Sequence, residues 1–143
     1  MDELFSKQAL SAYFKIWERI KNGETLSGDS GIIAEVMEAH PEFDPYWPEG
    51  ESAFRPQEID GSVVNPLVHT GVHVAVERQI AHQDPEEVEA ALKTLLKKGL
   101  SRHEAIHRIA SLWGGLYFRS IRQQGGSMEE GVYLEELRAL AEE

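Results

Sequence analysis

The sequence NPLVHTGVHVAVERQIAH occupies residues 65–82 and begins with a helix start signal. Asparagine is a favoured N-cap residue and the fixed φ of proline suits the first helical position, so Asn65-Pro66 marks the beginning of a helix. Apolar residues then recur at spacings of three and four, which is the period of an amphipathic helix. They are Leu67, Val68, Val72, Val76 and Ile80. The centre of the chain is therefore expected to be helical to about His82.

Comparable signals on both sides of this stretch predict further helices. Asp84-Pro85 repeats the Asn65-Pro66 signal, and Ser101 with Glu104 forms the S-x-x-E capping box. Gly23 and Gly99 supply stop signals, because glycine favours the left-handed conformation that ends many helices. The additional helices are expected over residues 2–22, about 32–40, 85–98, 101–124 and 128–143.

Residues 42–64 show no helical period. Prolines and glycines interrupt a run of acidic and aromatic residues there, so this segment is predicted to be a long irregular loop. Its aromatic residues are expected to anchor it on the core, and they are Phe43, Tyr46, Trp47 and Phe54. The predicted fold class is all-α: a single-domain helical bundle of about six helices over residues 1–143.

The composition is that of a globular protein, with 41% hydrophobic and 27% charged residues. A net charge of −11, from 14 Lys and Arg against 25 Asp and Glu, argues against nucleic-acid binding through a broad basic face.

No apolar run approaches the ~20 residues of a membrane span, so no membrane association is expected. The chain has no cysteine, which excludes disulfides and thiolate metal sites, and its start, MDELFSKQAL, lacks the features of a signal peptide. A soluble, cytoplasmic protein is expected. The sequence identifies no protein partner, and it leaves a homo-oligomer through the apolar residues of the tail open.

Four of the six histidines form two pairs with i, i+4 spacing, His69/His73 and His103/His107. Residues four apart project from the same face of a helix, so each pair can chelate one ion. Random placement of six histidines would give two separate pairs only about one time in fifty, by a simple count of pattern matches. If the three helices that begin near residues 65, 85 and 101 run up, down and up, their register permits both pairs to lie at one end of the bundle.

Imidazole nitrogen suits transition metals such as zinc, iron, nickel and copper. Glu77 lies one turn beyond His73, where its carboxylate could be a further ligand or could orient a ligand ring. The main hypothesis is therefore a transition-metal site with His69, His73, His103, His107 and Glu77. Zinc is the first expectation and iron the alternative. His40, which precedes Pro41 at a helix end, is expected chiefly to cap backbone carbonyls, with ligation as a lesser role, and His82 is expected at the surface.

Two alternatives remain beside this hypothesis. The histidines could form polar contacts in a metal-free helical interaction module. The run His103-Glu104-Ala105-Ile106-His107 also matches H-E-x-x-H, in which a zinc-dependent hydrolase holds zinc with both histidines and activates water with the glutamate. Against the hydrolase, Glu104 already has a structural role in the capping box. The sequence does not decide whether the protein is an enzyme.

Four segments of the chain form a combined pattern, and they are NPLVHTGVHVAVERQ at residues 65–79, QDPEEV at 83–88, GLSRHEAIHRIA at 99–110 and AHPEF at 39–43. Together they resemble a known bacterial family, domain of unknown function 1841 (DUF1841). The resemblance implies a small helical protein whose histidines at positions 69, 73, 103 and 107 occupy motif positions of the family. It implies no activity.

Overall fold

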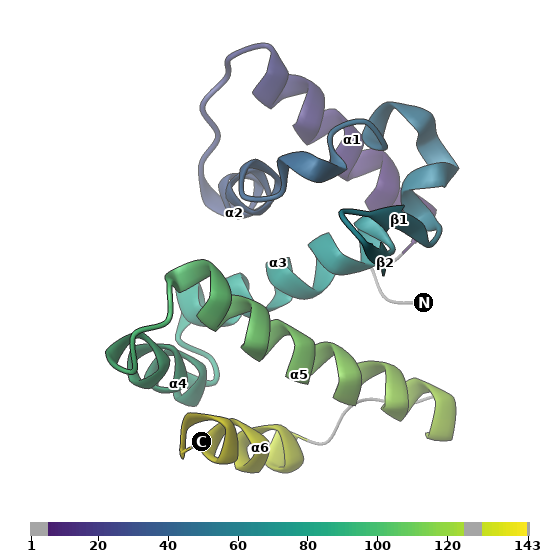
Figure 1. Ribbon diagram of the computed structural model, residues 1–143. Coiled ribbons are helices and arrows are strands. Elements are labelled where there is room, and N and C mark those ends of the chain that lie inside the picture. The colour runs from purple at the N-terminus through teal and green to yellow at the C-terminus, as the bar shows by residue number, and fades with distance from the viewer. Residues whose placement is uncertain (1–5, 125–129, 143) are drawn as a thin grey trace. The chain divides into compact units, whose positions relative to one another are not determined.

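The computed structural model describes residues 6–124 and 130–142, and the side chains of all of these except residues 121–124 and 130. Helices and one small hairpin make up the described chain, which confirms the all-α fold class (Figure 1). The chain forms two compact units, residues 1–74 and residues 75–143, and the central helix α3 (Pro66–His82) runs through the junction. The single domain expected over residues 1–143 stays a prediction.

The first unit begins with two helices, and only the end of the first follows its predicted signal, Gly23. Ser6, which was not among the predicted caps, is the N-cap of α1 (Lys7–Lys21), where its hydroxyl accepts a hydrogen bond from the Ala9 amide at 3.1 Å. Gly23, at φ +84°, follows the end of this helix in the left-handed conformation that glycine adopts without strain. The second helix begins at Gly28, earlier than the expected start near residue 32. Residues 2–5 of the expected first helix lie outside the described residues. The elements of the unit before α3 are α1 (Lys7–Lys21), α2 (Gly28–Glu38), the 3₁₀ helices η1 (Pro41–Phe43) and η2 (Trp47–Phe54), and the strands β1 (Gln57–Ile59) and β2 (Ser62–Val64).

The segment expected to be an irregular loop is more regular than predicted. It contains η1, η2 and an antiparallel hairpin in which Glu58 pairs with Val63. Asp60 and Gly61 both have positive φ, as a tight hairpin turn requires. Short 3₁₀ turns and three-residue strands carry too few positions to show a period, which is why the sequence pattern missed them. The expected anchoring is confirmed for Phe43 and Trp47, which are buried.

The start of α3 confirms its N-cap, because the Asn65 side-chain oxygen accepts from the Val68 amide at 3.2 Å. The next helix begins differently from the prediction. Pro85 has extended backbone (ψ 147°) and is itself the N-cap residue, so Asp84 does not cap this helix. The capping box before the following helix is confirmed by a 3.1 Å hydrogen bond from the Glu104 amide to Ser101 Oγ.

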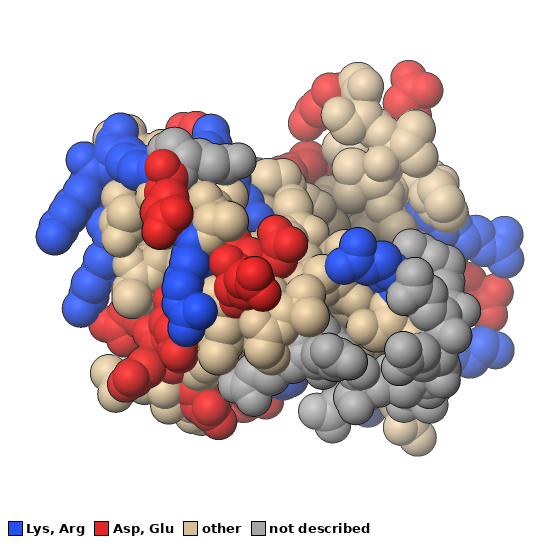
Figure 2. All heavy atoms as spheres, turned by 90° about the horizontal axis from the view of Figure 1, so that it is seen from below, with Lys and Arg blue, Asp and Glu red and all other residues tan. Residues whose placement is uncertain are grey.

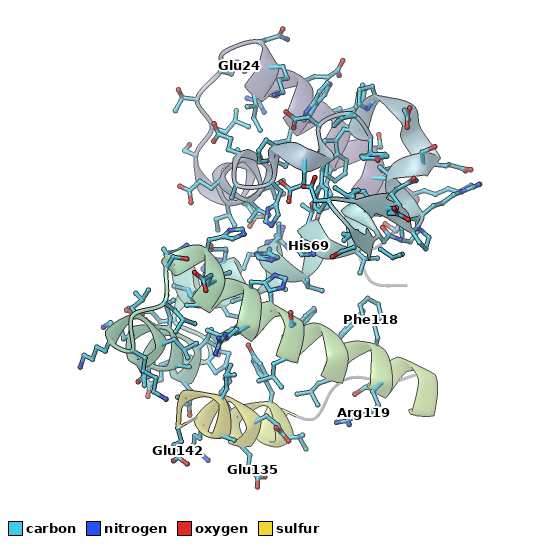
Figure 3. The ribbon with its side chains drawn as sticks, in the orientation of Figure 1. Glu24, His69, Phe118, Arg119, Glu135 and Glu142 are labelled. Atoms are coloured by element: carbon cyan, nitrogen blue, oxygen red, sulfur yellow. The ribbon has the colours of Figure 1, made fainter. Side chains whose placement is uncertain are left out.

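The second unit packs α4 (Glu86–Lys97) against both α5 (Arg102–Gln124) and α6 (Glu130–Glu142), and α5 also contacts α6. Of α6, Tyr133 and Leu137 are buried. The Tyr133 hydroxyl donates a 2.7 Å hydrogen bond to the Gln79 side chain on α3, and burial raises the pKa of Tyr133, so the phenol stays a donor. Glu135 and Glu142 project outward from the same helix (Figure 3).

Charged side chains of both signs are interspersed on the molecular face that Figure 2 presents. Charged side chains also pair along a single helix, as Lys93 does with Glu89 on α4 at 3.3 Å. Such exposed pairs contribute little to stability, about 0.3–0.5 kcal/mol at this spacing. Among the described residues, no helix combines the length and the apolarity that a membrane crossing requires.

The buried face of α6 gives a stability prediction. Leu137→Ala should lower the free energy of unfolding by about 2–5 kcal/mol, because it leaves a cavity where a fully buried side chain packs. Leu140→Ala on the same helix removes a side chain that is only half-buried and should cost clearly less. Urea denaturation of both variants measures the difference. Equal losses would show that α6 does not dock through Leu137.

Candidate metal centre

Three histidines of the first unit lie together. One ring nitrogen from each of His40, His69 and His73 lies within 4.8 Å of the corresponding nitrogen of the other two. The ring centroids are 4.7 to 4.9 Å apart for all three pairs. His40 and His73 are each 2% exposed and His69 is half-buried, so the cluster is largely shielded from water.

Helix α3 supplies two of these rings. His69 and His73 are four residues apart, so they project from one face of the helix with their rings stacked at an interplanar angle of 28°. Figure 3 shows His69 on this helix. The predicted pairing of His69 with His73 on one helix face is thereby confirmed.

The third ring comes from the end of α2. His40 cannot continue the helix, since the residue before a proline is pushed out of the α region, and its φ and ψ are −127° and 61°. Its Nδ1 lies 2.7 Å from the Val36 carbonyl oxygen, and because a carbonyl only accepts, Nδ1 carries the proton and donates. The expectation that His40 caps a carbonyl is confirmed. In this tautomer Nε2 keeps its lone pair, and a ligating histidine commonly has its other ring nitrogen bound in this way.

The residues after His40 hold its ring in place. Phe43 stacks on it with a centroid distance of 5.4 Å and an interplanar angle of 7°, and also meets His69 edge-on at 5.4 Å. With three residues per 3₁₀ turn, His40 and Phe43 share one face of η1. Asp44, at the end of η1, accepts hydrogen bonds from Trp17 Nε1 at 3.2 Å and from Lys21 Nζ at 2.6 Å. These bonds fix η1 to α1 and so help to position His40.

The other predicted site residues belong to the second unit. His103 and His107 lie on the exposed side of α5, four residues apart, while Ala105 and Ile106 between them are buried. His69 and His73 belong to the first unit and His103 and His107 to the second, and a metal shared by the two pairs stays a prediction. Within the H-E-x-x-H run, both the amide and the carboxylate of Glu104 are bonded to Ser101, which supports the capping role.

Glu77 has a partner that the sequence did not reveal. Both of its carboxylate oxygens accept hydrogen bonds from Arg102, at 2.7 and 2.9 Å, in a two-pronged ion pair between α3 and α5. This geometry suits guanidinium and carboxylate and is stronger than a single contact. Metal ligation by Glu77 stays a prediction, and it would have to compete with Arg102.

Fold and site together define a small helical protein with a buried cluster of histidines at the junction of η1 and α3. A comparison with protein families agrees with the motifs. The family described as "Domain of unknown function (DUF1841)" matches residues 6–139, and the chain belongs to this family. Searches of curated proteins and of solved structures each find no match.

The Glu77–Arg102 pair gives a second stability prediction. A double-mutant cycle with Glu77→Gln and Arg102→Gln should yield a coupling free energy of about 0.5–1 kcal/mol, because Glu77 is mostly buried although Arg102 is half exposed. The same cycle on Glu89 and Lys93, a single contact made by a largely exposed lysine, is the control and should give less. A coupling for Glu77–Arg102 that does not exceed the control would refute the structural role of this pair.

Proposed function

We propose that this protein binds a transition-metal ion through His40, His69 and His73, with zinc as the first candidate and iron as the alternative. The observation that carries the proposal is the convergence of three ring nitrogens within 4.8 Å in a largely buried place. Imidazole is a preferred ligand of both metals and a poor one for magnesium or calcium.

The geometry requires only small adjustments. Zinc in a tetrahedral site lies about 2.0–2.1 Å from each nitrogen, which sets the nitrogens about 3.4 Å apart. Nitrogens that already lie within 4.8 Å of one another reach this arrangement when each ring moves by roughly 1 Å. Rotation about the side-chain bonds of histidine is sufficient for such a shift.

Electrostatics favours a cation over protonated rings. Two imidazolium charges at the centroid separations of this cluster would repel each other by about 3–4 kcal/mol at an effective dielectric constant of 20. Three neutral rings instead present lone pairs, which a single cation can satisfy together. The metal-free alternative is that the rings hydrogen-bond one another, with an N–H of one donating to the nitrogen of the next.

An ion in this place would act as a cross-link. It would join the end of α2 and the start of η1 to the first half of α3, which are distant in sequence. Because the unfolded chain lacks this arrangement, the free energy of metal binding would add to the stability of the fold.

The proposal predicts bound metal that depends on each of the three histidines. Full-length protein purified without a tag or added metal should contain about one equivalent of zinc or iron by elemental analysis, as one preformed site would hold. His40→Ala and His73→Ala should each lose most of it, whereas His82→Ala, outside the cluster, should retain it. Circular dichroism shows whether each variant is folded.

The same assay tests the remaining predicted ligands. A His103→Ala/His107→Ala double variant that loses the metal would add these residues to the site, and full retention would exclude them. Glu77→Gln should retain the metal if Glu77 serves only Arg102. Trace metal in the wild type with no uptake on titration would overturn the proposal in favour of the metal-free interaction module.

Stability should depend on metal and on pH. At a free metal concentration 100-fold above the Kd, binding should add about 2.7 kcal/mol to the free energy of unfolding, and a chelator should remove this gain. Histidine ligates only when neutral, so the gain should be present at pH 7.5 and should shrink as the pH is lowered, because protons then compete with the metal for the ring nitrogens. Thermal unfolding with and without metal measures it, with His73→Ala as the variant that should not respond. A chelator that leaves the wild-type Tm unchanged at pH 7.5 would contradict the proposal.

A further inference from the structure

Thr70 lies between His69 and His73 in the sequence of α3 and carries a hydroxyl that is unpaired within the described part of the chain. The residue is fully buried on α3, and its Oγ1 has no hydrogen-bond partner among the described residues. A buried hydroxyl left without a partner costs about 1–3 kcal/mol. Valine has the same shape without that cost, so a threonine at this position is best explained by a hydrogen-bond partner outside the protein chain.

Other helical hydroxyls of this chain show what Thr70 does not do. Thr94 on α4 donates to the Ala90 carbonyl at 3.1 Å, and Ser120 on α5 donates to the Leu116 carbonyl at 2.9 Å. Both are the usual bonds of a helical hydroxyl to the carbonyl four residues earlier. The Thr70 hydroxyl does not take the equivalent bond to Pro66, so it is available to a group outside the helix.

The position of Thr70 on α3 places it next to the proposed ligands. It follows His69 directly and lies three residues before His73, and residues three apart on a helix have their Cβ atoms about 5–6 Å apart. At 100° per residue, Thr70 and His73 project about 60° apart around the helix axis. A small ligand on an ion held by His69 and His73 would lie within reach of a hydroxyl placed there.

We propose that the metal has one exchangeable coordination position, taken by water or a small inorganic anion, and that the Thr70 hydroxyl donates a hydrogen bond to that ligand. This inference rests on the proposed metal site. Three histidines plus an exchangeable ligand is the arrangement of zinc sites that bind small molecules, whereas structural sites are closed by four protein ligands. The class of ligand is therefore a small oxygen or nitrogen donor such as hydroxide, with azide as a convenient probe.

Cobalt(II) gives the test a readout that does not require an activity. The full-length protein is loaded with cobalt, and its visible absorption bands are followed during titration with azide. Azide should shift the bands saturably in the wild type. Thr70→Val should bind the same amount of cobalt but bind azide about tenfold more weakly, because a hydrogen bond to a charged ligand is lost.

Two further variants test whether weaker azide binding comes from loss of the Thr70 hydroxyl or from substitution in general. Thr70→Ser keeps the hydroxyl and should bind azide within about threefold of the wild type, a difference of well under 1 kcal/mol. Thr94→Val removes a hydroxyl already bonded to its own helix and should leave azide binding unchanged.

Each outcome bears on a different step. Failure of the wild type to bind cobalt would overturn the metal site itself. Bound cobalt with a spectrum that azide does not change would leave the metal site intact and overturn the exchangeable position. Equal azide affinity in the wild type and Thr70→Val would overturn the role of Thr70, and circular dichroism shows that each variant is folded.

Discussion

The last turn of a helix leaves carbonyl groups that need donors, and α2 meets this need with the side chain of His40. Pro41 stops the helix, and the His40 amide donates its hydrogen bond to the Met37 carbonyl. The Val36 carbonyl therefore accepts a hydrogen bond from Nδ1 of the His40 ring instead. That one hydrogen bond fixes both the orientation and the tautomer of the ring. The histidine cluster depends on it, since the same ring then meets His69 and His73 with a defined nitrogen lone pair.

The fold was predictable wherever a few neighbouring residues determine the local structure. Asn65, Ser101 and Gly23 act within one helical turn, and the structure confirms the helix ends they predict. The prediction was wrong at Asp84, where the extended backbone of Pro85 moves the helix start by one residue. Helical spacing within α6 does not reveal the buried Tyr133, because the partner of its hydroxyl, Gln79, lies on another helix.

The same distinction applies to the candidate site: local helical spacing predicts some of its residues, and tertiary contacts determine the others. His69 and His73 were recognisable because helical geometry alone puts residues four apart on one face. The sequence predicts chiefly a capping role for His40, because the proximity of His40 to the other two rings depends on where α2 ends and on the hydrogen bonds of Asp44 that hold η1 against α1. Glu77 has the correct helical spacing from His73, yet both its oxygens meet Arg102, a tertiary contact that spacing cannot reveal.

The charge of the proposed ligand set decides which fourth ligand suits the ion. His40, His69 and His73 bind as neutral imidazoles, and the chain has no cysteine whose thiolate could offset a divalent charge. An ion in a largely buried cluster would therefore keep nearly its full charge, which is costly where water is excluded. A small anion on the ion would reduce that charge, and a nearby hydroxyl donor would stabilise the anion in turn. The same electrostatic argument therefore connects the neutral histidines, the buried position of the cluster and the hydroxyl of Thr70.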